Sequence, residues 1–308
     1  MSERDAPAAM LRQRAAYGWR VMHRLSGVLR ARLRPLATTT RTPVAFNAMY
    51  DAAAPAALDR ERRELERFDL YLFDAMNTPR LRGQIVFEYG TLLRAVPSWA
   101  GLRVLDIGTG RSTLPRWMSA AGAAVTTFDL ASPVEKAGAG FQERVDAIVA
   151  RRPRILRAVS GSMRALPFAP SSFDLVTSLS VVEHLDTDLP ARTYVPYAEQ
   201  RRRLAEVLDE MIRVTRSGGC VYVTSECCDY ARATADAWRG AYYYDDGPPL
   251  SGAWPVGDVR ALFYDEMARR GLALIGDDAF AADDIALERR WTWRGPYFSG
   301  FSMLARKP

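Results

Sequence analysis

The feature that most constrains the fold is an alternation of short apolar runs with helical segments across the middle of the chain. Five runs of six to eight residues, rich in β-branched side chains, fit β-strands: residues 102–107, 123–130, 154–160, 172–179 and 219–225. Such alternation is typical of parallel strands joined by crossover helices. The sequence therefore predicts an α/β fold with a doubly wound, mostly parallel sheet.

The clearest helix covers residues 198–216, where apolar residues recur at helical spacing and predict packing on the sheet. This stripe consists of Leu204, Val207, Leu208, Met211 and Val214. We expect this helix to stop at the glycines of Ser217–Gly219. A later helix is expected over residues 256–274, with a glycine stop and Asp258 as its cap.

The first 41 residues carry the positive charge of the chain. They contain nine arginines and two acidic residues, Glu3 and Asp5, which give a net charge of +7. The whole chain has a net charge of +6, so residues 42–308 carry a net charge of −1. We predict a basic amphipathic helix over residues 10–36, which packs on its own domain, frays in solvent, or makes a weak contact with a membrane surface or a protein. Because the body is slightly acidic, we do not expect a nucleic-acid substrate.

Residues 42–98 are predicted to form a helical cap between the basic arm (1–41) and the main domain (99–308). One helix is expected over residues 58–76 and another over residues 82–96, the second ended by Pro97. The first has an apolar face made of Leu58, Leu65, Phe68, Leu72 and Met76.

Composition excludes several classes of protein. No apolar run approaches the roughly 18 to 20 residues that span a bilayer, and the N-terminus lacks a signal-peptide pattern, so we expect a cytoplasmic protein. Cys220, Cys227 and Cys228 are too few and too close for a disulfide framework. His23 and His184 do not match the usual zinc spacings, and no metal is expected.

The motif VLDIGTG, residues 104–110, places Gly108 and Gly110 directly after a strand. Glycine there lets the backbone approach a nucleotide at the carboxyl edge of a parallel sheet, although a tight turn alone also explains it. Asp129 follows nineteen residues after Gly110, which suits a carboxylate that binds both ribose hydroxyls; an ordinary surface aspartate is the alternative. Thr113 stands where a dinucleotide site needs glycine, which favours a nucleoside without pyrophosphate.

With these motifs in order, residues 100–225 resemble the class I S-adenosylmethionine (SAM) dependent methyltransferases. VLDIGTG resembles the glycine loop of that family, and TTFDL at 126–130 resembles its ribose strand. Residues 161–185 resemble its adenine loop and fourth strand, and residues 210–225 the helix and strand that follow. The resemblance implies a Rossmann-like, mostly parallel seven-stranded sheet, SAM as the cofactor, and an acceptor-pocket insertion at about residues 226–257.

The resemblance also implies which residues hold the methionine and ribose parts of SAM. Asp106 and the backbone at Gly108 and Gly110 would line the methionine part, and Asp129 would take the ribose. Arg111 either pairs with the methionine carboxylate or faces solvent.

The remaining implied contacts surround the adenine and the amino group. Leu130 would pack on adenine, and Ser162 and Met163 fall in the loop that reads its edge, where the family usually has an acidic side chain. The backbone at Ser178 and Leu179 would approach the amino group of SAM.

Catalytic residues are few in this chemistry, because SAM already carries a leaving group and a base is needed only when the acceptor must lose a proton. His184 is the candidate base; its alternative role is to shape the pocket. In the aromatic stretch 241–250, Tyr243 and its neighbours would face the substrate or the sulfonium. The aromatic stretch 289–301 is expected to be a terminal strand that packs in the core.

We therefore predict in-line methyl transfer from SAM to a small-molecule acceptor of the natural-product or glycan type. One alternative is a SAM cyclase or lyase of the azetidine-forming kind, which releases methylthioadenosine. The other is a noncatalytic SAM-binding protein that uses the basic arm as its contact.

Overall fold

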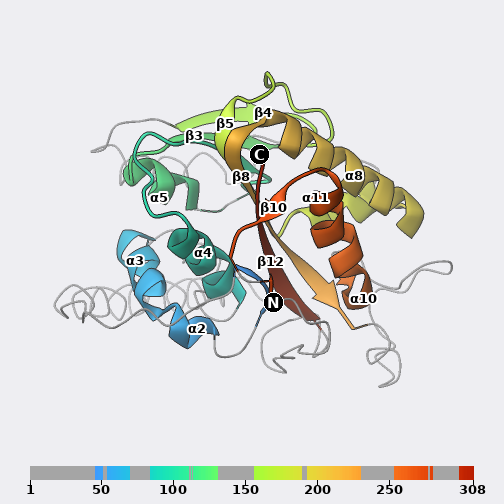
Figure 1. Ribbon diagram of the computed structural model, residues 1–308, viewed down its shortest axis with the longest axis horizontal. Coiled ribbons are helices and arrows are strands. Elements are labelled where there is room, and N and C mark those ends of the chain that lie inside the picture. The colour runs from blue at the N-terminus through green and yellow to red at the C-terminus, as the bar shows by residue number, and fades with distance from the viewer. Residues whose placement is uncertain are drawn as a thin grey trace, which may run out of the picture.

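The computed structural model describes residues 46–50, 54–69, 84–110, 112, 114–130, 156–188, 193–229, 253–276, 278–279 and 298–308. The predicted arm helix, Arg111 and the tyrosine stretch 241–250 lie outside these residues. The described part is a ten-stranded sheet between two helical layers (Figure 1). Within it, no helix is long and apolar enough to cross a membrane.

Five parallel strands form the centre of the sheet. They lie in the order β4 (Leu156–Ser160), β3 (Ala124–Asp129), β2 (Arg103–Ile107), β5 (Phe173–Leu179) and β8 (Thr215–Cys228). The chain runs outward from β2 to β4 and then returns to β5, so the strand order reverses between β2 and β5. In open α/β sheets, ligands bind at the carboxyl ends of the strands at such a switch point. The predicted doubly wound, mostly parallel sheet is confirmed.

The other strands extend the sheet beyond β8. Antiparallel β12 (Phe298–Arg306) pairs with β8 along nine residue pairs. Four strands of two or three residues complete the sheet, which has ten strands among the described residues rather than the expected seven. They are β1 (Asn47–Met49), β9 (Trp254–Pro255), β10 (Ala273–Leu274) and β11 (Asp278–Ala279). Two further strands, β6 (Thr187–Asp188) and β7 (Thr193–Tyr194), form a separate pair.

Strand β1 comes from the segment that the sequence predicted to be a helical cap. The Asn47 side chain fixes it at the edge: its Nδ2 donates to the carbonyl of Ile275 (2.9 Å), and its Oδ1 accepts from the backbone N–H of Leu304 (2.8 Å). The N-terminal segment therefore contributes a strand to the sheet as well as helices.

One helical layer consists of α2 (Ala54–Ala57), α3 (Asp59–Asp69), α4 (Gln84–Ala95) and α5 (Leu114–Ala120). It packs on one face of the sheet through a core that includes Leu58, Leu92 and Val104. Helices α3 and α4 are also joined by a buried ion pair between Glu61 and Arg94, with 2.7 Å between Oε2 and a guanidinium nitrogen. The predicted helix over 82–96 is confirmed as α4.

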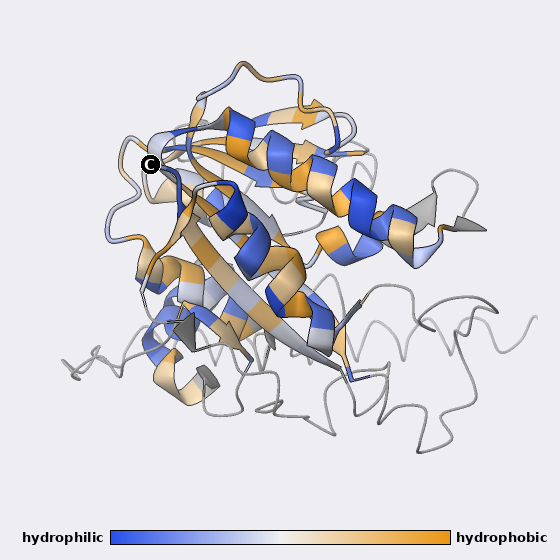
Figure 2. Ribbon diagram, turned by 45° about the vertical axis from the view of Figure 1, so that its right-hand side comes forward, coloured by the Kyte–Doolittle hydropathy of each residue, from blue (hydrophilic) through white to orange (hydrophobic). Residues whose placement is uncertain are grey.

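The opposite layer consists of η2 (Val182–Asp186), α8 (Tyr197–Val214), α10 (Val256–Val259), the π-helical turn η3 (Arg260–Tyr264) and α11 (Asp265–Arg269). The five predicted stripe residues of α8 are at most 1% exposed, which confirms that this face packs on the sheet. In Figure 2, hydrophilic and hydrophobic residues alternate along α8, as in an amphipathic helix, and the central strands are mainly hydrophobic.

Two local expectations are wrong. Helix α8 ends at Val214, before the glycines, because Thr215 adopts an extended backbone and its hydroxyl donates to the carbonyl of Met211 (2.7 Å). Strand β8 starts there, and Gly218 (φ +75°) lies inside it. Asp258 does not cap a helix, since it lies within α10 and accepts a hydrogen bond from the Tyr197 hydroxyl (2.5 Å).

The last strand bears out part of the terminal-strand expectation. Strand β12 begins at Phe298, and Phe301 is fully buried against Phe263, with 4.7 Å between ring centroids. Residues 289–297 lie outside the described residues.

Candidate functional site

The glycine loop follows β2 at the switch point of the sheet. Gly108 and Gly110 both have positive φ, +71° and +55°, which side chains disfavour. A Cβ added to Gly108 would lie 2.3 Å from Cγ1 of Val181, so this position has no room for another residue. At Gly110 the nearest atom to an added Cβ is 3.8 Å away, which leaves the backbone open to a ligand.

Asp129 links the loop to the end of the neighbouring strand β3. Its Oδ2 accepts a hydrogen bond from the backbone N–H of Gly110 (2.8 Å), and its Oδ1 accepts one from Leu130 (2.7 Å). Its carbonyl accepts from the N–H of Gly161 (2.9 Å), at the start of the predicted adenine loop. Three sequence motifs that were predicted separately therefore meet at one residue, Asp129: the glycine loop at its carboxylate and the adenine loop at its carbonyl.

Asp106 lies beneath the loop, at 3% exposure. Its two carboxylate oxygens accept hydrogen bonds from the hydroxyls of Thr177 (2.7 Å) and Thr109 (2.8 Å). Burial raises the pKa of Asp106 to about 6, although these two hydrogen bonds act in the opposite direction. At neutral pH the site therefore contains a negative charge that is held away from water.

The residues predicted to contact adenine follow the carboxyl ends of β3 and β4, and they differ in solvent exposure. Leu130 is 53% exposed at the end of β3. Ser162 is exposed and its Oγ accepts from the N–H of Arg164 (3.3 Å), whereas Met163 packs partly against the core. Leu130 therefore offers an open apolar surface beside Asp129.

Ser178 and Leu179 end β5 next to the glycine loop. Ser178 pairs with Ile107 in the sheet and is fully buried. Its Oγ has no hydrogen-bond partner among the described residues. Leu179 is half-buried and packs against the cluster beneath the N-terminal helices.

The candidate base, His184, is exposed on η2, whereas its neighbour Glu183 is buried. The Glu183 carboxylate accepts from the Ser225 hydroxyl (2.6 Å), and its carbonyl accepts from Nε2 of Gln200 (3.2 Å). Burial first, and then the carboxylate of Glu226, raise the pKa of Glu183 well above its usual range. Sequence reasoning missed Glu183, although an acidic residue inside the apolar stretch VVEHL was a signal.

Glu88 is a second missed residue and comes from helix α4. It is 2% exposed, and its Oε1 accepts a hydrogen bond from the hydroxyl of Ser180 (2.7 Å), just after β5. The next residue, Tyr89, has its hydroxyl 3.0 Å from the Oγ of Ser112, just after the glycine loop. Nothing local in the sequence signals these contacts, because they depend on where α4 packs.

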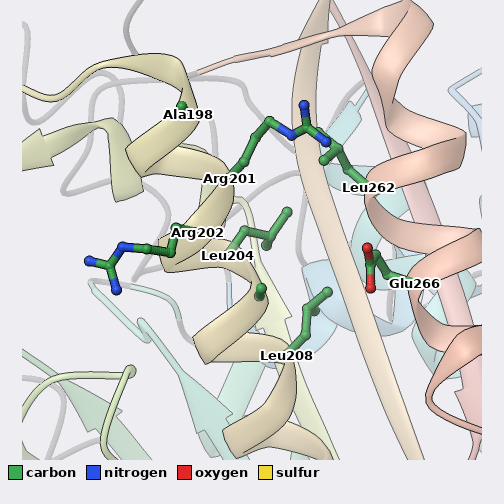
Figure 3. Close-up of a pocket in the computed structure, with 8 residues that line it drawn as sticks. Ala198, Arg201, Arg202, Leu204, Leu208, Leu262 and Glu266 are labelled. Carbon is green, nitrogen blue, oxygen red and sulfur yellow. The ribbon is translucent and has the colours of Figure 1, made fainter.

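A separate cavity of about 360 Å³ lies between α8 and the η3–α11 segment (Figure 3). Its apolar lining includes Leu204, Leu208 and Leu262, with Arg201 and Glu266 beside them. No residue of the glycine loop lines it. This cavity is therefore separate from the glycine loop.

Comparisons with known proteins agree with this geometry. A family model described as a methyltransferase domain matches residues 105–223. A demethylmenaquinone methyltransferase from Mycobacterium sp. (strain KMS) is 30% identical over 210 residues, which are 67% of this chain and 68% of the relative. A malonyl-[acyl-carrier protein] O-methyltransferase from Enterobacter lignolyticus (strain SCF1) is 27% identical over 148 residues, about half (48%) of either chain.

A solved structure from Methanosarcina mazei, titled as a SAM-dependent methyltransferase, is 16% identical. It aligns with a TM-score of 0.45 over 70% of this chain and 96% of that chain. On the family match and the Mycobacterium relative, this chain belongs to the class I SAM-dependent methyltransferases and is an enzyme that uses SAM as its cofactor.

Proposed function

We propose that this enzyme transfers the methyl group of SAM to a small-molecule acceptor at the carboxyl edge of β2, β3 and β5. The observation that carries the proposal is the Asp129 carboxylate, which already binds the backbone of Gly110 and Leu130. A carboxylate held in this way at the end of β3 suits the vicinal hydroxyls of a ribose. The glycine loop beside it suits close approach of the rest of the nucleoside.

We propose which residues contact each part of SAM. We assign the ribose to Asp129 and the adenine to the exposed apolar surface of Leu130, with Ser162 and Met163 at its edge. The negative charge of Asp106 favours a cationic ligand, and the backbone at Ser178 and Leu179 is assigned to the amino group. Arg111 is assigned to the methionine carboxylate.

The protein's main tasks are to orient the two reactants and to keep water out. When bound, SAM would supply a methyl group on a sulfonium: an acceptor lone pair would bond the methyl carbon as the carbon–sulfur bond breaks in line, with S-adenosylhomocysteine as the leaving group. The turn after β5 packs Val181 against Gly108 and so closes one side of the site. His184, on the same segment, is proposed to take a proton from acceptors that must lose one.

We place the acceptor pocket in the insertion at about residues 226–257, with Tyr243 among its lining residues. The relatives act, by their names, on demethylmenaquinone and on malonyl-[acyl-carrier protein]. The first acceptor to test is demethylmenaquinone, because two thirds of this chain aligns with methyltransferases of that name.

Mass spectrometry of both products tests the proposal. The purified chain is incubated with SAM, with and without demethylmenaquinone, and the variant Asp129→Ala serves as the control. We expect S-adenosylhomocysteine and a methylated acceptor only when acceptor and intact enzyme are both present. Methylthioadenosine formed without an acceptor would instead identify a SAM cyclase or lyase, and unchanged SAM in every arm would contradict this acceptor.

A further inference from the structure

Helix α4 lies outside the residues that match the methyltransferase family, yet it contacts both loops that flank the glycine motif. The Glu88 carboxylate accepts a hydrogen bond from the hydroxyl of Ser180, in the turn after β5. The Tyr89 hydroxyl is hydrogen-bonded to the hydroxyl of Ser112, in the loop after the glycine motif. Ser112 in turn accepts from the backbone N–H of Leu114 (3.2 Å), at the first turn of α5. One helix of the N-terminal segment therefore touches the loops on both sides of the cofactor edge.

Ser180 has a backbone conformation that a residue with a side chain adopts only at a cost. Its φ is +51°, and among the described residues Ser171 is the other non-glycine residue with positive φ. Two contacts hold Ser180 in place: its N–H donates to the carbonyl of Thr224 (3.0 Å), and its hydroxyl donates to Glu88 (2.7 Å). The second contact depends on a side chain that only α4 supplies.

The conformation of Ser180 sets the position of the next residue, Val181. Val181 lies against Gly108 so closely that a Cβ on this glycine would fall 2.3 Å from its Cγ1. A change of φ at Ser180 would move Val181 relative to the glycine loop. The fit between the two loops therefore depends on the contact between Ser180 and Glu88.

Glu88 itself is held firmly. It is buried on α4, and its carbonyl accepts from the hydroxyl of Tyr222 in the centre of the sheet (2.8 Å). The carboxylate of Glu88 therefore has a fixed place from which to orient Ser180.

We propose that Glu88 is a positioning residue for SAM binding: its buried carboxylate holds Ser180 in the left-handed conformation and so fixes the β5–η2 turn against Gly108. This inference rests on the proposed SAM site. It extends that site to a helix that the family match does not include, and it makes the N-terminal segment part of the cofactor-binding machinery.

Two substitutions at Ser180 test the inference in the full chain, with SAM affinity measured by calorimetry. Ser180→Ala removes the hydroxyl and keeps the Cβ, so we expect the Kd for SAM to rise at least fivefold. Ser180→Gly also removes the hydroxyl, but glycine adopts positive φ without support, so we expect the Kd to rise less than twofold. Equal losses in the two variants would overturn the proposal.

A double-mutant cycle with Glu88 supplies the second measurement. Glu88→Ala should weaken SAM binding at least fivefold in the wild-type background and less than twofold in the Ser180→Gly background. Glu88→Gln keeps an oxygen that accepts a hydrogen bond from the Ser180 hydroxyl, so its Kd for SAM should stay within threefold of the wild-type value. The same fold-loss from Glu88→Ala in both backgrounds would contradict a role through Ser180.

Two controls separate positioning from general damage. Ser171→Gly changes the other left-handed serine, whose N–H bonds the carbonyl of Arg213, and should leave SAM affinity unchanged. Glu61→Gln weakens the link between α3 and α4 without touching Ser180, and should lower stability but not SAM affinity. A loss of SAM affinity in Glu61→Gln equal to that in Glu88→Ala would overturn the inference.

Asp129→Ala, measured in parallel, distinguishes failure of this inference from failure of the proposed site. If Asp129→Ala leaves SAM affinity unchanged, the SAM site is misplaced and the inference fails with it. If Asp129→Ala weakens binding while Ser180→Ala and Ser180→Gly behave alike, only the role of Glu88 is refuted.

Discussion

Replacing Asp106 by asparagine should stabilise the free protein and weaken its binding of SAM. The pKa of Asp106 is raised by burial from 3.8 to about 6. Between these two pH values the folded state binds more protons than the unfolded state, so the free energy of unfolding falls as pH rises, and the loss is complete above pH 6. A difference of about 2 pH units, at ~1.36 kcal/mol each, corresponds to about 3 kcal/mol.

Asparagine removes the charge and keeps the hydrogen bonds, because the hydroxyls of Thr177 and Thr109 can each donate or accept. In urea unfolding, Asp106→Asn should be more stable than the wild type by about 3 kcal/mol at pH 8 and by about half of that at pH 5. Its midpoint should shift without a change in slope.

The same substitution removes a negative charge from beneath the proposed site of SAM, a cation. The Kd of the wild type for SAM should rise as pH falls below about 6, where Asp106 becomes protonated. At pH 8 the Kd of Asp106→Asn for SAM should be several-fold higher than that of the wild type. It should not show the rise below about pH 6 that the wild type shows. A variant that is less stable at pH 8, or equally stabilised at pH 5 and pH 8, would refute the reasoning.

Two further predictions concern the glycine loop and a surface ion pair. Gly108→Ala should abolish SAM binding and destabilise the protein by roughly 2 kcal/mol or more, since its Cβ meets Val181. Gly101→Ala has similar φ (+78°) in open space, so it should cost only about 1 kcal/mol in urea unfolding and leave SAM affinity unchanged. Burial raises the pKa of Asp174, but hydrogen bonds from Arg103 and Arg216 outweigh it and lower this pKa to about 2. The stability that Asp174 contributes is therefore present above about pH 4 and lost as pH falls through 2. Asp174→Asn should be less stable than the wild type at neutral pH, and most of this difference should disappear by pH 2; a constant difference across this range would contradict the assignment.

The sequence predicts the centre of this protein well, because its strands and loops obey local rules. The β2, β3 and β5 strands start and end within one residue of the predicted runs. Gly108 and Asp129 could be identified because a positive-φ turn and a carboxylate at a strand end leave a clear residue signature. These residues depend mainly on neighbours in the same motif.

The features that sequence reasoning missed depend on contacts between distant segments. Strand β1 forms because Asn47 bonds Ile275 and Leu304, more than 200 residues away. Glu88 matters because α4 packs beside the end of β5, which no periodicity in its own segment reveals. The early end of α8 is the exception, because it is local: the Thr215 hydroxyl bonds the carbonyl of Met211 in the preceding turn and favours a stop before the glycines.

The claim on which the account depends is that SAM lies at the carboxyl edge of β2 and β3 with its ribose on Asp129. Isothermal titration calorimetry of SAM with the wild type, Asp129→Ala and Asp209→Ala tests it directly. Asp209 is a matched carboxylate, 65% exposed, that pairs with Arg270 on the surface. We expect Asp129→Ala to bind SAM at least tenfold more weakly, a loss of about 1.4 kcal/mol, and Asp209→Ala to bind it as the wild type does. Equal affinity of all three proteins would contradict it.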